Sequence, residues 1–161
     1  MADTNRAVLK LKERFADAIL DVKEFRGEVT VTVKKEEILE VLKCLKTDLR
    51  FNFLTDVTAV DYLGQDPRFM VVYQLYSIPN RERIRIKAPV GGANPSIDSA
   101  TALWSTANWL EREVYDLMGI TFNNHPDLRR ILMTDDWVGH PLRKDYPLQG
   151  PDREAYKGRL S

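Results

Sequence analysis

Residues 28–49 read EVTVTVKKEEILEVLKCLKTDL, and the spacing of the apolar side chains changes within this stretch. Three valines first alternate with polar residues, which predicts a half-buried strand over residues 28–33. From residue 34 to residue 48 the apolar positions recur with helical spacing instead. These helical positions are Ile38, Val41, Leu42, Leu45 and Leu49. A strand followed directly by an amphipathic helix predicts helices packed on a sheet.

Three further strands are expected after this helix. Residues 51–62 are rich in aromatic and β-branched side chains, and residues 69–78 are apolar on both faces, as in a central strand. Turn signals at residues 64–67 and 79–80 separate the segments. In residues 83–87, RIRIK, two isoleucines alternate with three cations, so one face is solvated. Those cations are expected to discourage edge pairing or to meet an acidic partner.

Helical spacing also appears at both sides of this central region. Residues 5–20 predict an amphipathic helix with apolar positions Val8, Leu11, Phe15, Ala18 and Ile19. Ser96 or Asp98 could cap a short helix that runs to Trp104. A further helix is expected over residues 106–118.

The last predicted helix has a clear end and an expected internal ion pair. Gly119 is a good C-terminal stop, and Arg112 with Asp116 would form an i,i+4 pair. The expected fold is therefore α+β: a mixed sheet of about four strands with helices packed on it and an extended C-terminal arm. Because a helix joins the first two strands, they should run parallel, and the later strands should form a meander. The body spans residues 1–120, and residues 121–161 form an arm that docks on a partner subunit.

The composition is that of an ordinary globular protein. The 161 residues are 43% hydrophobic and 30% charged, with a formal net charge of zero. A nucleic-acid role is not expected, since it usually leaves a basic footprint. The N-terminal residues 1–15 lack a long apolar run, so neither a secretory signal nor a membrane helix is predicted there. We therefore expect a cytosolic protein that is attached to a larger assembly.

The single cysteine, Cys44, lies among apolar residues of a predicted helix, where a buried structural thiol is expected. Iron–sulfur clusters need about four thiolate ligands, so this chain cannot hold one alone. No serine sits in a glycine-flanked elbow, and no glycine-rich nucleotide cradle is present. The sequence gives no support for catalysis by the isolated chain.

One enzymatic hypothesis remains, a free-standing metal-dependent enzyme that uses His125 and His140. Aspartates lie close to both histidines in the sequence. However, fifteen residues of irregular chain separate the two, and this spacing fixes no ligand geometry. Histidines in structural hydrogen bonds are the simpler interpretation.

The segment from residue 123 to residue 147 favours binding over catalysis. It interleaves arginines and aspartates with large apolar residues, and Trp, Tyr and Arg dominate the energetics of protein interfaces. Prolines at positions 126, 141, 147 and 151 would reduce the entropy lost on docking. The alternative is that the arm folds back over the chain's own sheet.

Residues 111–148, EREVYDLMGITFNNHPDLRRILMTDDWVGHPLRKDYPL, resemble the signature of the C subunit of the proton-pumping NADH:quinone oxidoreductase, respiratory complex I. The resemblance runs through residues 111–113, 115–116 and 119–120, then through 125–132 and 139–147. The strand-rich body also fits this family. Met118 departs from it, since members often carry an aromatic residue there, and this leaves packing details open.

The resemblance implies a cofactor-free structural subunit in the hydrophilic arm of the complex, bracing the large quinone-site subunit next to iron–sulfur subunits. FMN and the iron–sulfur clusters would belong to partner subunits, so the chain would be enzymatic only as part of the translocase. It would be peripheral on the cytoplasmic face of a prokaryotic membrane, associated with it only through the complex. The equivalent subunit of a membrane-bound hydrogenase or another quinone-reducing dehydrogenase is the alternative. The expected partner interface comprises Arg129, Arg130, Trp137, His140, Arg143, Lys144, Asp145 and Tyr146.

Overall fold

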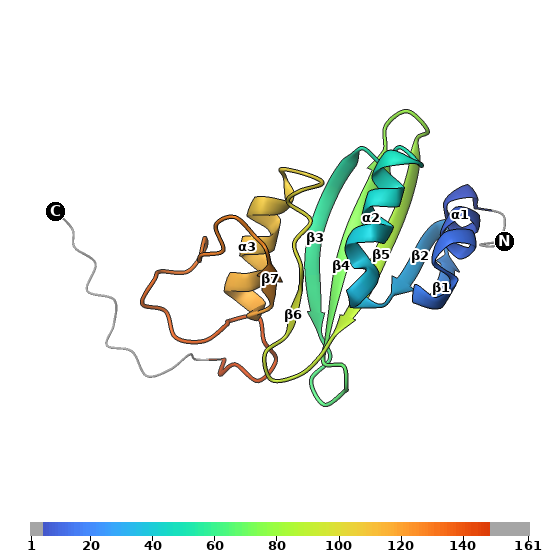
Figure 1. Ribbon diagram of the computed structural model, residues 1–161. Helices are drawn as coiled ribbons and strands as arrows, with labels where there is room; N and C mark the ends of the chain where they lie inside the picture. Colours follow the sequence, from blue (N-terminus) through green and yellow to red (C-terminus); the bar gives the residue numbers. More distant parts are fainter. Residues whose placement is uncertain (1–4, 149–161) are drawn as a thin grey trace.

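The computed structural model describes residues 5–148 and contains two sheets (Figure 1). The larger has five strands in the order β1-β2-β5-β4-β3, and the smaller pairs β6 with β7. The α+β class is confirmed, with one strand more in the main sheet than the sequence predicts. Residues 149–161 of the expected arm lie outside the described residues.

The elements follow one another without internal repetition. In chain order they are α1 Arg6–Phe15, η2 Ala16–Ala18, β1 Ile19–Phe25, β2 Glu28–Val33, η3 Lys35–Glu37, α2 Ile38–Thr47, β3 Phe53–Asp61, β4 Phe69–Ser77, β5 Glu82–Val90, β6 Ser96–Asp98, α3 Ala107–Met118 and β7 Thr121–Asn123.

The main sheet is mixed. Strands β3, β4 and β5 form the predicted antiparallel meander, and β2 pairs in parallel with β5. Consequently β2 and β3 run in the same direction, as predicted, although β5 and β4 lie between them. The expectation that the cations discourage edge pairing does not apply to β5, because it is bonded on both sides and is not an edge strand. One of these cations, Arg85, instead pairs with Glu28 on β2 at 2.8 Å.

The N-terminal helix is shorter than predicted. Helix α1 ends at Phe15, and the chain continues into β1, which pairs antiparallel with β2. The turn between them uses positive φ at Arg26 (53°) and Gly27 (79°). This tight reversal brings β1 beside β2, and the hydrogen bonds of this hairpin replace the helical continuation expected through residue 20.

The short helix expected through Trp104 is wrong, because no helix forms between residues 96 and 104. Residues Ser96–Asp98 instead form β6. This strand pairs in parallel with β7, the strand that follows α3 in the sequence. In this pairing Ile97 lies opposite Phe122, and both are buried. The strand forms because its backbone finds a partner that is distant in the sequence, which local spacing cannot reveal. Through this pairing, residues beyond 120 are tied to the body, and the division of the chain at residue 120 stays a prediction.

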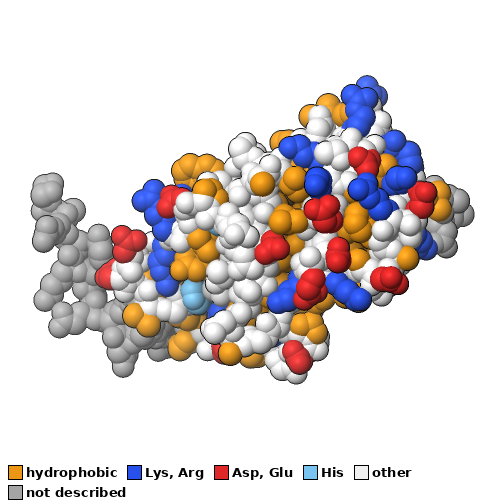
Figure 2. All heavy atoms as spheres, viewed as in Figure 1, with side chains coloured by type: hydrophobic (Ala, Val, Ile, Leu, Met, Phe, Trp, Pro, Cys, Tyr) orange, Lys and Arg blue, Asp and Glu red, His pale blue; other side chains and the backbone are white. Residues whose placement is uncertain are grey.

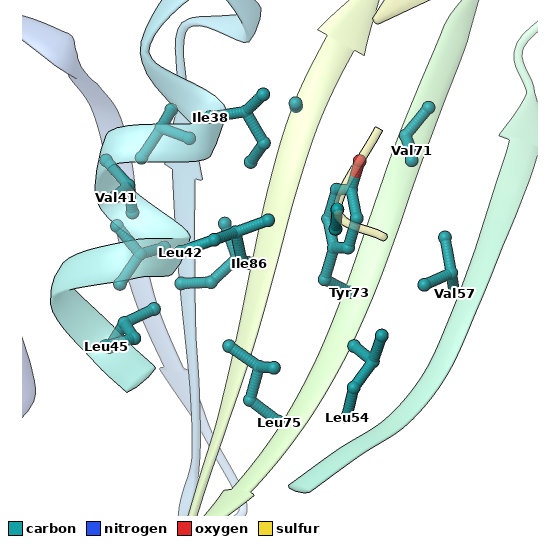
Figure 3. Packing of buried hydrophobic residues seen from close by; sticks show 14 of the residues in the cluster. Ile38, Val41, Leu42, Leu45, Leu54, Val57, Val71, Tyr73, Leu75 and Ile86 are labelled. Carbon is teal, nitrogen blue, oxygen red and sulfur yellow. The ribbon is translucent and has the colours of Figure 1, made fainter. Parts of the chain in front are cut away.

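The core lies between the sheet and α2, as Figure 3 shows. Helix α2 turns its apolar side toward Ile86 of β5 and Leu75 of β4, while Tyr73 continues the core toward β3. The predicted burial of Cys44 on this helix is confirmed. Each large side chain buried here contributes roughly 1.5–3 kcal/mol relative to an exposed position. Helix α3 packs beside β3, so the sheet provides a rigid base for the C-terminal segment (Figure 1).

Candidate functional site

Helix α3 presents two charged side chains to the segment that follows it. Arg112 and Asp116 are one helical turn apart, and both are buried. The predicted ion pair between them is wrong, because each instead contacts residues 124–148, which we call the arm from here on. The i,i+4 spacing therefore serves to place both groups on the same side of the helix.

Asp116 binds the arm through both carboxylate oxygens. Its Oδ2 accepts the backbone N–H groups of Ile131, Leu132 and Met133 at 3.0, 2.8 and 2.8 Å. Its Oδ1 accepts from the guanidinium of Arg130 at 2.6 Å. Burial alone would raise the pKa of this carboxyl, but the three amides and the arginine outweigh it and lower the pKa. Asp116 is therefore an ionised anchor for the arm.

Arg112 binds backbone carbonyl groups of the same arm segment. Its Nε donates to the carbonyl oxygen of Arg129 at 3.1 Å, and its Nη2 donates to that of Arg130 at 3.0 Å. The guanidinium also lies over the ring of Trp109, 5.3 Å from the ring centroid. Arg112 and Asp116 together form what we call the α3 clamp, which holds the carbonyls and the amides of one arm segment.

The C-terminal end of α3 forms a second contact with the arm. Arg143 donates from Nε to the carbonyl oxygen of Met118 at 2.6 Å and from Nη2 to that of Gly119 at 3.1 Å. A cation is favourable here because the unpaired carbonyls carry the negative end of the helix dipole. His140 Nδ1 lies 2.9 Å from the carbonyl oxygen of Asp116, so this nitrogen carries the proton. Burial, with nearby arginine charges, lowers the pKa of His140.

Gly119 makes this contact possible. It confirms the predicted helix stop, with φ of 71° as the C-terminal cap of α3. A Cβ at this position would lie 2.5 Å from the imidazole of His140 and would also clash with Arg143. The residue is therefore glycine for two reasons, backbone conformation and the close approach of the arm.

A third contact joins the arm to the sheet. Arg68 forms a bidentate pair with Asp61, with both distances 2.8 Å, and a second bidentate pair with Asp145 of the arm at 2.9 and 2.7 Å. The backbone N–H of Lys144 also donates to Asp61 at 2.8 Å. Two carboxylates on one guanidinium make a geometrically specific link.

The predicted interface residues therefore fall into two groups. Arg130, His140, Arg143 and Asp145 all bind this chain, and Tyr146 donates to the carbonyl oxygen of Val138 at 3.2 Å. Arg129 has a side chain 72% exposed and pairs with its neighbour Asp127, while Lys144 is exposed and Trp137 is half-buried. The alternative is that the arm folds back over the chain's own sheet. Most of these contacts are instead with α3, and the arm reaches the sheet through Asp61 of β3 and Arg68 just before β4.

Sequence reasoning did not single out four of the anchoring groups for this role: Asp61, Arg68, Arg112 and Asp116. Two of them lie within the resembling signature, where their helical spacing was the available signal. The other pair flanks the turn between β3 and β4, and nothing in the local pattern relates it to the arm.

The two histidines do not converge. His125 Nδ1 accepts the backbone N–H of Asp127 at 3.0 Å, so its Nε2 carries the proton toward the carbonyl oxygen of Asn108 at 3.1 Å. His140 is engaged with Asp116. Within residues 5–148, no group of three or more His, Cys, Asp and Glu side chains is placed to hold a metal ion. This geometry gives no support to the metal-enzyme hypothesis.

Apolar side chains remain on the outside of the clamp. Trp109, Leu132, Val138 and Leu142 are each more than half exposed. Together with Arg129 we call them the outer arm surface. The ring of Trp109 lies against the guanidinium of Arg112, which donates to an arm carbonyl. The start of α3 and the arm are therefore adjacent. On the face shown in Figure 2, positive and negative side chains are interspersed with hydrophobic ones. Within residues 5–148, no helix has the length and apolar character needed to cross a membrane.

Residues 31–152 match the family described as respiratory-chain NADH dehydrogenase, 30 kDa subunit. The chain belongs to this family. The matched range starts in β2 and includes the meander, α3 and the described arm, so it covers most of the main sheet and the clamp segment. The resemblance to the C subunit of complex I is thereby confirmed.

Curated relatives that are named as the C subunit match this chain over all or nearly all of its length. The chain is 79% identical over 161 residues to the C subunit of NADH-quinone oxidoreductase from Citrifermentans bemidjiense, with all of both chains covered. It is 53% identical to the protein of that name from Roseiflexus sp., over 97% of this chain and 91% of the relative.

Solved structures share the fold of this 30 kDa subunit. The trypsin-resistant fragment (1-134) of Nqo5 superposes with a TM-score of 0.68 at 36% identity, covering 77% of this chain and 100% of that one. A chain in the structure of the membrane-bound sulfane sulfur reductase, an archaeal respiratory membrane complex, superposes with a TM-score of 0.76 at 21% identity. It covers 88% of this chain and 84% of that chain, and it shows the fold alone.

Proposed function

We propose that this chain is a structural subunit in the hydrophilic arm of a proton-translocating NADH:quinone oxidoreductase. It holds no cofactor itself and braces the large quinone-site subunit, while FMN and iron–sulfur clusters belong to partner subunits. The family and the names of its full-length relatives support this proposal. High identity along the entire chain favours this complex over a hydrogenase or another quinone-reducing dehydrogenase. The subunit would be peripheral, on the cytoplasmic face of the membrane.

One observation carries the bracing role. Three charged groups of the signature, Asp116, Arg130 and Arg143, are used within the chain. Left exposed are the four large apolar side chains of the outer arm surface, three of them on the segment that these groups hold in place. A preordered apolar surface loses little entropy on docking, and exposed aromatic and aliphatic side chains of this kind mark protein interfaces. We therefore propose that the outer arm surface contacts the partner, with the clamp residues shaping it.

The proposal can be tested in native membranes with an affinity tag on this chain. The substitutions Trp109→Ala and Leu132→Asp remove apolar contacts from the outer arm surface. We expect recovery of the whole complex, and NADH:quinone activity, to fall at least about tenfold if a central contact is lost. Phe25→Ala on β1 is the matched control, because Phe25 is equally exposed but belongs to the opposite end of the sheet.

Two results would contradict the proposal. One is an intact, active complex with both Trp109 and Leu132 replaced, which would exclude the outer arm surface. The other is a stoichiometric metal, flavin or cluster found by metal analysis and absorption spectroscopy on the purified chain. That finding would overturn the cofactor-free role whatever surface docks.

A further inference from the structure

Helix α3 carries a buried carboxyl group on the side that does not bind the arm. Glu111 is completely buried, and its Oε2 and Oε1 accept from the hydroxyl of Ser99 at 2.6 Å and from the backbone N–H of Ala100 at 2.7 Å. Among residues 5–148 it forms no ion pair, unlike Asp116, which has Arg130. Glu111 thus joins α3 to the segment after β6 without a compensating cation.

The groups that surround Glu111 are neutral or acidic. From β4 comes the Tyr73 hydroxyl, which is fully buried and has no hydrogen-bond partner within the described part of the chain. From β6 comes Asp98, whose charge, like that of Glu111, raises the pKa of Tyr73. The turn contributes the hydroxyls of Ser99 and Thr101, which lie 2.8 Å apart. Burial therefore opposes a negative charge on Glu111.

The cations of the neighbouring elements are engaged elsewhere. Lys46 of α2 donates to the carbonyl oxygen of Leu103 and lies over the ring of Trp104, 5.6 Å from its centroid. Arg112, the next residue along α3, donates to the arm carbonyls. Neither cation compensates the carboxyl.

We propose that Glu111 is a proton-operated latch: protonated, it stays packed between α3 and the turn at Ser99, and its ionisation favours opening of this contact. Because α3 also holds the arm through Arg112 and Asp116, opening would loosen the α3 clamp as well. The latch would make the attachment of the arm sensitive to pH near neutrality. This inference does not depend on which partner the arm binds.

The stability of the closed contact depends on pH in a definite direction. Burial raises the pKa of Glu111 from its ordinary 4.5 to about 7, although the bonds from Ser99 and Ala100 oppose the rise. The protonated form is therefore favoured in the closed state, in which the carboxyl donates to Ser99 Oγ and the Ser99 hydroxyl donates to Thr101 Oγ1, 2.8 Å away. The stabilisation it provides is complete below pH 4.5 and is lost as the pH rises through about 7.

Hydrogen exchange on the full-length chain, corrected for intrinsic rates, measures this opening directly. Between pH 5 and pH 8 the opening constant of the Ala100 amide and of the α3 amides should rise roughly ten- to hundredfold. In Glu111→Gln it should stay within about twofold over the same range. The matched control is Glu113→Gln, an exposed position on the same helix, which should keep the wild-type dependence.

A second measurement keeps the proposal falsifiable if Glu111→Gln does not fold. Carbon-13 NMR of glutamate side chains in the wild-type chain should show one carboxyl titrating near neutral pH, and Ser99→Ala should move its midpoint higher by removing a donor to the charged form. Parallel pH profiles of wild type and Glu111→Gln, or a Glu111 midpoint at its ordinary value, would overturn the latch.

Discussion

Asp116 on α3 and Arg130 on the arm form an ion pair of 2.6 Å in which the Asp116 side chain is fully buried and the Arg130 side chain is 17% exposed. The neighbouring Arg129 is 72% exposed. Two adjacent arginines of one signature thus have different environments. Arg130 therefore stabilises the fold, whereas Arg129 is available to a partner.

Arg130→Ala should destabilise the chain strongly, and Arg129→Ala should not. The first leaves Asp116 buried without its counter-charge, which costs about 3–5 kcal/mol for a broken buried pair. The second removes an exposed pair with Asp127, which is worth about 0–1 kcal/mol. Urea unfolding of the two variants measures both values. Equal losses would show that Arg130 does not anchor the arm. From the sequence alone we expect both variants to affect assembly more than folding, and the structure leads us to keep that expectation for Arg129 only.

Gly119→Ala should cost more than a glycine-to-alanine change at another positive-φ turn. At Gly64, φ is 88° and no atom lies within 4 Å of the added Cβ, so Gly64→Ala reports the backbone strain alone, roughly 1–2 kcal/mol. At Gly119 the Cβ also meets His140 and Arg143. We expect an additional loss on the order of 1–3 kcal/mol from forced displacement of the arm. Thermal unfolding of both variants tests this, and an equal loss in the two would mean that the arm moves away freely.

Acid should loosen the arm. The Arg68 fork lowers the pKa of Asp61 and of Asp145, and backbone amides with Arg130 lower that of Asp116 against burial. Each group stabilises the folded chain above its ordinary pKa of 3.8, and this contribution is lost as the pH falls through the lower folded value. The free energy of unfolding should therefore fall below about pH 4. In Asp61→Asn the decrease should be smaller, and an unchanged acid profile would exclude Asp61 as a contributor.

The thiol of Cys44 should report global unfolding. It is buried on α2, and burial, followed by the charge of Asp48, raises its pKa. A protonated, inaccessible thiol reacts slowly, since the thiolate is the nucleophile. Labelling with a disulfide reagent should be complete in denaturant and slower by orders of magnitude in buffer at pH 7. Rapid labelling of the native chain would contradict the packing of α2 on the sheet.

Local periodicity was sufficient for the elements whose apolar side faces the core. The alternating valines of β2, the helical spacing of α2 and the two-faced apolar run of β4 all form as predicted. Gly119 ends α3 as expected. These features can be predicted from nearby residues, because the spacing of apolar side chains along an element shows which of its sides faces the core.

The sequence by itself therefore determined the α+β class, the meander, the helix end and the family of this chain. Tertiary structure decided that β1 and β6 are strands, that Arg112 and Asp116 bind the arm instead of each other, and that Arg130 faces inward beside an outward Arg129. Strand β1 forms because a two-residue turn lets it pair with β2, and the other cases share a different physical reason. Hydrogen-bond and ion-pair partners that are distant in the sequence are chosen only when the packed sheet and α3 bring their backbones together.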